Sequence, residues 1–309
     1  MKKNSEAHSR NKALTATTLG ILFVSTASIF IRLSQNEASA IVIGASRLLI
    51  ACLILVPIAL IRNRAELFSL SHSELLQGSL SGLFLALHFA SWITSMQYTS
   101  IASSVVLVTT TPLWVALLSP VVLKEPVRKS VLIGLIISLT GTIIVSIADA
   151  CSFINGSWQC MFQFFSKDTL WGNFLALFGA WMAAGYFLMG RQLRKKLTTV
   201  PYAAFVYSVA ALILLSIVVI RREPVFSYSG TTYIWLLALG LFPQLLGHSL
   251  LNWALKYVSA AYVSLMLLGE PIGTIILAFL FLKETPTPVE GVGAILIMIG
   301  IVVGSVSGS

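Results

Sequence analysis

Long apolar runs, separated by short polar stretches, follow one another along nearly the whole chain. Ten runs can be delimited, at residues 14–31, 41–61, 75–95, 103–123, 131–147, 170–189, 203–220, 233–251, 261–282 and 292–306. They are close to the ~20 residues that a helix needs to cross a bilayer. Because lipid offers no partner to backbone polar groups, runs of this length are expected to be helical. The sequence therefore predicts an all-α membrane protein with ten transmembrane helices.

The composition agrees with a lipid environment. Hydrophobic residues make up 57% of the chain and charged residues only 10%, whereas soluble domains carry roughly 25% charged residues. Membrane β-barrels would require strands of ~10 residues with alternating polarity, and that pattern is not found in the sequence. The lipid bilayer is therefore an expected partner of the protein.

The net charge of +9 is distributed unevenly between the segments that join the apolar runs. One set of alternate segments holds most of the basic residues: Lys2, Lys3, Arg10, Lys12, Arg62, Arg64, Lys124, Arg128, Lys129, Arg191, Arg194, Lys195, Lys196 and Lys256. The other set holds Arg32, Lys167, Arg221, Arg222 and Lys283. Because basic segments stay in the cytoplasm, this asymmetry predicts a cell inner membrane protein with both termini cytoplasmic. Nucleic acid is not an expected partner, because a nucleic-acid surface gathers its charge on one folded face.

The three cysteines do not indicate a metal site. Cys52 lies inside the second run and is expected to pack there. Cys151 and Cys160 lie in the long segment 148–168, which the charge rule places outside, where disulfides can persist. Their spacing leaves both a disulfide and two free thiols open.

An internal repeat organises the chain. The segment that begins at Tyr98 recurs 159 residues later at Tyr257, with Pro112 falling on Pro271. Further matches at the same offset are Ser100 and Ser259, Ala102 and Ala261, Leu123-Lys124-Glu125 and Leu282-Lys283-Glu284, Gly134 and Gly293, Gly141 and Gly300, and Ser146 and Ser305. The repeat predicts two five-helix units, at residues 1–147 and 169–309, joined by an extracytoplasmic linker at 148–168.

Five spans in each half have a topological consequence. An odd number means that the second half enters the membrane from the side opposite to the first, so the repeats are inverted. Inverted repeats are typical of secondary transporters, in which two halves rock around a central site. This architecture predicts a small-molecule substrate bound between the halves.

The repeated motifs resemble a known family. The Tyr-x-Ser-x-Ala start at Tyr98 and Tyr257, the prolines Pro112 and Pro271, the Lys-Glu that ends the run and the glycine-rich run that follows are similar to the EamA domain. The resemblance covers both halves and implies a drug/metabolite transporter. Members of that superfamily carry amino acids, nucleotide sugars, organic phosphates, S-adenosylmethionine and drugs, so the resemblance does not fix the substrate.

Ionisable groups inside spans are costly, by ~2.5–3.5 kcal/mol at mid-helix, and are therefore candidates for a central cavity. Glu270 lies before Pro271, and its counterpart in the first half is Thr111. Glu270 is expected to bind a cationic group or a proton beside a proline kink. Arg47, in the second run, can bind a carboxylate or phosphate. The alternatives are an Arg47–Glu270 structural pair and a side chain that extends to the membrane surface.

Two histidines are further candidates. His88 and Trp92 are four residues apart in the third run, as are His248 and Asn252 in the eighth. Residues four apart share one face of a helix. The two pairs align only after a shift of one residue. They are expected to donate or accept hydrogen bonds in the cavity or to relay protons, the alternative being buried structural histidines.

Among the aromatic residues, Trp114 and Tyr262 are expected to line the site. Trp114 lies near Pro112 on the face of Thr111. Most other aromatic residues of such a chain pack against neighbours or sit at the lipid interface.

Glycines recur in the fifth and tenth runs, at Gly134 and Gly141 and at Gly293, Gly300 and Gly304. Small residues at this spacing let helices approach closely, so these runs are expected to pack together or against a second copy in a homodimer.

Motifs for ATP binding, metalloprotease chemistry and nucleophile elbows are absent from the sequence, so neither a cofactor nor an enzymatic activity is expected. The predicted function is a secondary transporter, as exporter or exchanger, of small metabolites such as amino acids. Uptake or exchange of nucleoside-bearing metabolites and an intramembrane enzyme remain the alternatives.

Overall fold

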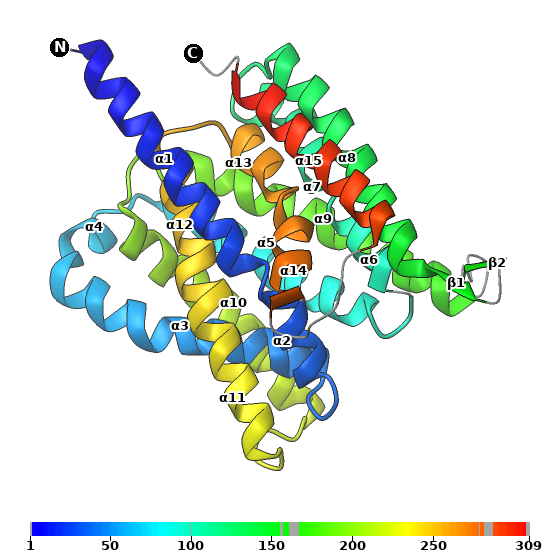
Figure 1. The fold of residues 1–309 in the computed structure, drawn as a ribbon. Coiled ribbons are helices and arrows are strands. Elements are labelled where there is room, and N and C mark those ends of the chain that lie inside the picture. The colour runs from blue at the N-terminus through cyan, green and yellow to red at the C-terminus, as the bar shows by residue number, and fades with distance from the viewer. Residues whose placement is uncertain are drawn as a thin grey trace.

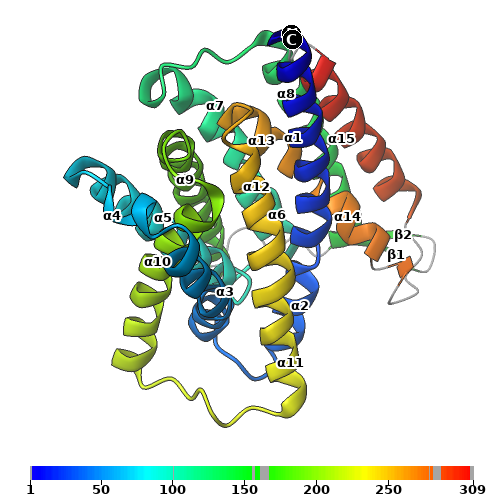
Figure 2. The same ribbon diagram turned by 90° about the vertical axis from the view of Figure 1, so that its left-hand side faces the viewer.

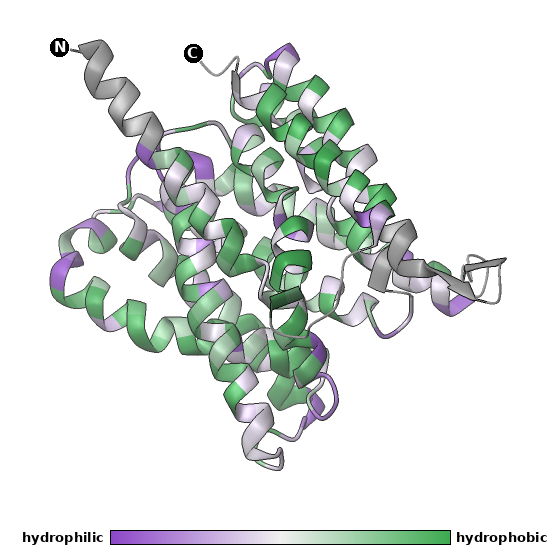
Figure 3. Ribbon diagram, in the orientation of Figure 1, coloured by the Kyte–Doolittle hydropathy of each residue, from purple (hydrophilic) through white to green (hydrophobic). Residues whose placement is uncertain are grey.

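The structure is a computed structural model that describes residues 2–99, 101–154, 157–160, 167–277, 279–280 and 287–306 (Figure 1). In these residues nine helical segments are long and apolar enough to cross a membrane, and a further apolar helix at Lys129–Val145 is shorter. Each coincides with one predicted run. The predicted all-α membrane fold is thus confirmed, and Figure 3 shows apolar residues along the helices and hydrophilic ones near their ends.

The helices of the first half are α1 (Lys2–Val24), α2 (Ala27–Ser34), α3 (Ala40–Arg62), α4 (Arg64–Phe68), α5 (His72–Ser95), α6 (Ile101–Val108), α7 (Thr111–Val122) and α8 (Lys129–Ala150). Those of the second half are α9 (Lys167–Leu193), α10 (Thr199–Arg221), α11 (Gly230–Leu239), the π-helix η1 (Gly240–His248), α12 (Ser249–Ala254), α13 (Ala260–Leu267), α14 (Glu270–Leu277) and α15 (Pro288–Val306).

A short antiparallel hairpin lies between the halves, formed by β1 (Cys151–Ile154) and β2 (Ser157–Cys160). Its register places the backbone of Cys151 opposite that of Cys160. Their side chains lie outside the described residues, so the disulfide stays a prediction, as do the boundaries 1–147, 148–168 and 169–309.

Serine residues mark where several spans begin. Ser39, Ser71, Ser229 and Ser259 precede α3, α5, α11 and α13, and each accepts a hydrogen bond from a backbone N–H in the first turn. Such caps satisfy donors that a helix start leaves without a partner. Short polar connections therefore end one span and begin the next.

The loops at one end of the spans are tied together by polar contacts. Glu66 of α4 accepts hydrogen bonds from the backbone N (2.7 Å) and the hydroxyl of Thr198. Partial burial raises the pKa of Glu66, but these bonds and one from Asn63 outweigh it and leave the pKa below its usual value. We call this end the basic face; it comprises loops 62–72, 123–129, 194–199 and 255–260 and carries most basic residues of the loops.

A second group of contacts ties the loops at the opposite face. The backbone N of Ser229 donates to Glu37 at 2.7 Å, and Gln35 donates to the carbonyl oxygen of Ile93 at 3.2 Å. Thr99 donates to Asn173 at 2.7 Å. Successive spans therefore run between two separate faces, and Figure 2 shows α1 beginning and α15 ending near one another at the top.

The internal repeat is visible as two helix breaks at equivalent positions. The fourth span is divided into α6 and α7 at Thr109–Thr110, and the ninth into α13 and α14 at Leu268–Gly269, 159 residues later. Pro112 and Pro271 lie in the first turn of α7 and α14, where a missing backbone N–H is tolerated. The proline motif therefore starts a new helix in each half.

The third and eighth spans differ by one residue. α5 has 24 residues, whereas Gly230–Ala254 has 25 and contains the π-helix η1 with Pro243 inside it. A π-turn accommodates one additional residue within a helix. Ser71 and Ser229, which precede these spans, are 158 residues apart, whereas Tyr98 and Tyr257, which follow them, are 159 apart, so the extra residue restores the repeat offset within the eighth span.

The fifth and tenth spans pack directly on one another, which confirms the first of the two predictions made from their glycines. A Cβ atom at Gly134 would lie 2.3 Å from the oxygen of Gly300, and one at Gly141 would lie 2.6 Å from that of Gly293. Ser138 donates across the contact to the oxygen of Ile297 at 3.1 Å. The glycines let the two backbones touch and so join the ends of the two repeats. A homodimer stays a prediction.

A pair of substitutions in α15 tests this contact. Gly300→Ala would place a Cβ 2.2 Å from Ser138 Oγ and 2.4 Å from the oxygen of Gly134, whereas Gly291→Ala meets nothing within 4 Å. Overpacking costs ~1–3 kcal/mol, so Gly300→Ala should lower the thermal unfolding midpoint in detergent. Gly291→Ala should leave the midpoint unchanged or raise it. Equal midpoints for the two variants would contradict the close contact.

Candidate functional site

A cavity of about 70 Å³ lies in the middle of the helix bundle, large enough for several water molecules. The apolar part of its lining is Val24, Ala27, Phe89, Val108, Pro112, Ala183, Phe187, Leu267 and Leu268. The polar part is Arg47, His88, Trp92, Thr109, Thr111, His248 and Glu270. The structure thus brings six of the nine predicted site residues together on one cavity.

The cavity lies where spans are interrupted. It touches the breaks between α1 and α2, between α6 and α7 and between α13 and α14, and it also touches the end of η1. At such interruptions, backbone groups and polar side chains at mid-membrane become available to a ligand. At the first break, Ser25 donates to the backbone oxygen of Glu270 at 3.0 Å, which holds α1 against α14.

Both repeats contribute equivalent positions to the lining. At the offset of 159 residues the cavity-lining pairs are Val24 and Ala183, Phe89 and His248, Val108 and Leu267, Thr109 and Leu268, and Thr111 and Glu270. The cavity therefore lies between the two repeats, and equivalent positions of both contribute to its lining. Within these pairs the ionisable groups come from the second repeat only, so the chemistry of the site is not symmetric.

Arg47 is the most constrained residue of the site. Its side chain is 1% exposed, its Nε donates to Gln244 Oε1 at 2.9 Å, and its guanidinium carbon lies 4.1 Å from the centre of the Phe89 ring. The two terminal nitrogens have no hydrogen-bond partner among the described residues. A guanidinium held in place at Nε therefore presents two free donors, which suit a planar oxyanion.

The histidines and aromatic residues form one stacked group. His88 Nδ1 donates to the oxygen of Gly179 at 2.9 Å, and its ring stacks on Trp92 with centroids 5.7 Å apart. His248 meets the edge of Phe89 at 5.7 Å. At the unshifted repeat offset the partner of His248 is Phe89 rather than His88, yet both histidines line the cavity. Trp92 Nε1 and His248 Nδ1 are buried without a partner among the described residues.

Glu270 begins α14 at the cavity, and its carboxylate has no hydrogen-bond partner in the described part of the chain. No ion pair joins it to Arg47 in the same part, so the predicted structural pair between them is not formed. Thr111, its repeat counterpart, donates to the oxygens of Val108 (2.7 Å) and Ala180 (3.4 Å). Glu270 and Arg47 thus line the same cavity without forming an ion pair in the described part of the chain.

Three predicted site residues lie outside the lining. Trp114 donates to Thr110 Oγ1 at 3.1 Å and meets the edge of Trp181. Tyr262 borders a different pocket, at the basic face, and its hydroxyl lies 2.9 Å from Ser305 Oγ. Asn252 is fully buried and does not line the cavity.

Two contributors were not predicted. Gln244 accepts a hydrogen bond from Arg47, and Phe89 contacts both Arg47 and His248. Gln244 is a polar residue within the eighth run, next to Pro243. The unfavourable free energy of a polar side chain in lipid could have identified it as a site candidate. Phe89 has no distinguishing signal in a chain rich in phenylalanine, because only its neighbours in space give it a role.

Asn252 instead joins three helices. Tyr186 of α9 donates to Asn252 Oδ1 at 2.8 Å, and Asn252 Nδ2 donates to the hydroxyl of Tyr207 of α10 at 3.1 Å. All three side chains are at most 1% exposed, and Tyr186 also meets the edge of His248. These hydrogen bonds hold α9, α10 and α12 together next to the cavity, and Asn252 itself does not line it.

The arrangement fits recognition better than metal binding. In the described residues no group of three or more His, Cys, Asp or Glu side chains could hold a metal ion. The cavity combines free guanidinium donors, a carboxylate, imidazoles and aromatic rings. Such a set offers contacts to groups of either charge and to apolar groups.

The fold is that of a polytopic membrane protein of two repeats with a polar cavity between them, an architecture typical of transporters. The sequence model of the EamA-like transporter family matches residues 11–147 and 170–306, and the chain belongs to this family.

Similar proteins agree with the family. The uncharacterized transporter YetK of Bacillus subtilis is 26% identical over 74% of this chain and 66% of its own length. An uncharacterized transporter of Archaeoglobus fulgidus is 23% identical over 95% of this chain and 96% of its own length. One crystal structure matches with a TM-score of 0.79 at 18% identity, over 97% of this chain and 98% of that chain, which shows a shared fold.

Two substitutions test the support beneath the cavity. Asn252→Leu leaves the hydroxyls of Tyr186 and Tyr207 without that partner, and an unsatisfied buried polar group costs ~1–3 kcal/mol. We expect a clearly lower unfolding midpoint in detergent. Tyr98→Phe, at a tyrosine that is 41% exposed, serves as the control and should not change the midpoint. A variant Asn252→Leu as stable as the control would exclude a supporting role.

Proposed function

We propose that the protein is a secondary transporter that binds a small solute in the central cavity and exposes it alternately to the two sides of the membrane. The observation that carries the proposal is the position of the cavity, which is lined by repeat-related residues at three interrupted spans. Two inverted halves that rock around such a site can close one side while opening the other.

The solute that the lining supports best is a zwitterion of amino-acid size. Arg47 offers two free donors to a carboxylate, and Glu270 offers an acceptor without a partner to an ammonium group. Phe89, Trp92 and Phe187 form an apolar and aromatic wall for a side chain.

We further propose that the basic face is cytoplasmic, in the cell inner membrane, and that the protein works as an exporter or an exchanger. Support for the orientation comes from the basic residues of loops 62–72, 123–129, 194–199 and 255–260. Movement of solute down its own gradient, exchange and proton coupling through Glu270 or a histidine all use the same cavity.

Counterflow in liposomes tests transport directly. Purified protein is reconstituted, the liposomes are preloaded in turn with amino acids, polyamines, nucleotide sugars or S-adenosyl compounds, and uptake of the labelled compound is followed. We expect transient accumulation with amino acids, because a carrier exchanges solute across a closed membrane. Accumulation with a nucleoside-bearing compound alone would reject the proposed substrate class. Conversion of a compound by protein in detergent would favour an enzyme.

Substitutions at the two charges test the cavity as the binding site. Arg47→Ala and Glu270→Gln each remove one charged contact, worth ~1.5–3 kcal/mol, or roughly 10- to 100-fold in affinity. Initial rates of counterflow at low solute concentration should fall by that order. Leu117→Ala, on a side chain that is 63% exposed, is the matched control and should transport normally. Normal rates for both charge variants, with folded protein in the membrane, would rule out this assignment.

A further inference from the structure

The basic face contains a second group of charges that takes no part in the cavity. Arg191, in the last turn of α9, donates through Nε to both oxygens of Glu125, at 3.1 and 3.3 Å. Lys195 lies 3.4 Å from the same carboxylate. The side chains of Arg191 and Glu125 are only 15% and 24% exposed, so water screens this pair less than a surface pair.

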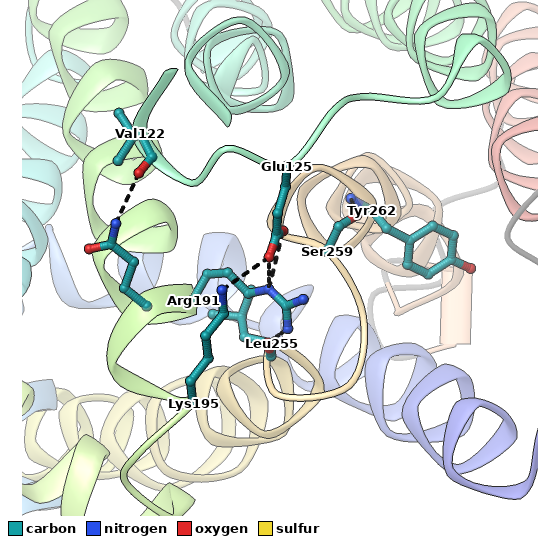
Figure 4. A network of polar contacts seen from close by, with 8 residues as sticks. Val122, Glu125, Arg191, Lys195, Leu255, Ser259 and Tyr262 are labelled. Carbon is teal, nitrogen blue, oxygen red and sulfur yellow. Dashed lines mark hydrogen bonds and ion pairs between the residues drawn. The ribbon is translucent and has the colours of Figure 1, made fainter. Parts of the chain in front are cut away.

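These contacts bind parts of the two repeats to one another (Figure 4). Glu125 belongs to the loop that follows α7 in the first repeat, whereas Arg191 ends α9 in the second. Arg191 also donates through a terminal nitrogen to the carbonyl oxygen of Leu255, at the end of α12. Gln192 donates to the oxygen of Val122 at 3.0 Å. We call the contacts of Glu125 with Arg191 and Lys195 the latch.

The backbone next to Glu125 supports a specific placement of the carboxylate. Lys124 has a backbone φ of 55°, a value that residues other than glycine rarely adopt. Such backbone strain persists only where surrounding contacts hold it, and it often accompanies residues with a defined task. Here it turns the chain at the end of α7 so that Glu125 meets Arg191.

Near the latch, the two broken spans pack together at the basic face. α7 and α13, the halves of the two broken spans nearest the basic face, pack on one another. In the described part of the chain no contact of similar extent joins α6 and α14, their repeat counterparts near the opposite face. Two inverted repeats in identical conformations would pack both pairs equally. The contact between α7 and α13 closes the bundle between these two helix halves on the basic face.

A pocket of about 320 Å³ lies beside the latch, bordered by Glu125, Arg128, Tyr257, Ser259 and Tyr262. Its lining also includes Ser119 of α7, which is 2% exposed, and Gly304 of α15.

We propose that the latch is the gate of the basic face: it is formed when this face is closed, and it must break each time the cavity opens there. The inference rests on the proposed transport function, because a gate has meaning only in a protein that opens alternately. Charge-assisted hydrogen bonds across two rigid segments suit this task, since they are directional and can exchange with water when the segments part.

Accessibility of a cysteine in the cavity tests the gate without knowledge of the substrate. Ala183→Cys, at a cavity-lining position that is 5% exposed, is introduced with Cys52→Ala, Cys151→Ser and Cys160→Ser. Membrane vesicles of each orientation are treated with a membrane-impermeant maleimide, and the rate of modification is measured from each side. In the protein with an intact latch, the cavity cysteine is expected to be modified faster from the opposite face than from the basic face.

Breaking the latch should reverse this preference. Arg191→Ala and Glu125→Gln are each expected to speed modification from the basic face about tenfold and to slow it from the opposite face, because they shift the population toward the other conformation. The exchanged pair Glu125→Arg with Arg191→Glu should restore part of the original rates. Arg32→Ala, at the repeat counterpart of Arg191 on the opposite face, is the control and should not speed modification from the basic face.

The outcomes separate this inference from the proposed function. Unchanged rates in Arg191→Ala and Glu125→Gln, with normal counterflow, would overturn the latch and leave transport intact. Equal modification from both sides without any latch dependence would overturn it as well. A reversed preference confirms the gate even if no tested solute shows counterflow, since it needs no substrate.

Discussion

A guanidinium held in the middle of a membrane protein must have its charge compensated. Arg47 is buried among apolar helices, where an unpaired cation is costly. The protein supplies one amide oxygen from Gln244 and the face of Phe89, and it leaves two donors open toward the cavity. The neighbouring carboxylate of Glu270 offsets the charge across that space without touching it. This incomplete compensation is the physical basis of the proposal that the cavity binds a solute with an anionic group.

The scaffold around Arg47 follows from the repeat. Two five-helix units bring equivalent breaks, Thr109–Thr110 and Leu268–Gly269, to the same depth. Each break is followed by a proline in the first turn of a new helix, so helix ends at these breaks line the cavity together with the continuous helices α3, α5 and α9. The glycines of α8 and α15 join the repeats at their far ends, where the backbones touch. The halves also pack on one another through α3 and α5 against α9 and α10, where apolar side chains such as Phe205 and Val209 meet glycines of α5.

The sequence was sufficient to predict the spans, because lipid constrains length and hydrophobicity more strongly than it constrains packing. The offset between Tyr98 and Tyr257 predicted the repeat, and the cost of charge in lipid indicated Arg47 and Glu270. The role of Asn252 was beyond this reasoning, since a buried amide can face a cavity or neighbouring tyrosines at the same spacing. The π-helix η1 lies in a span one residue longer than α5, and no composition signal marks it. Gln244 and Phe89 acquire their roles only through contacts between distant spans.

Ligand-induced stabilisation of the purified protein tests the central claim, that the cavity around Arg47 is the solute site, most directly. Thermal unfolding is followed in detergent with and without amino acids, for the unaltered protein and for Arg47→Ala. A ligand at 100 times its dissociation constant stabilises a folded protein by ~2.7 kcal/mol, so the midpoint of the unaltered protein should rise. Because Arg47→Ala is expected to weaken binding roughly 10- to 100-fold, the same ligand should raise the midpoint of this variant much less. A rise of equal size in both proteins would show that the solute binds elsewhere and would contradict the account.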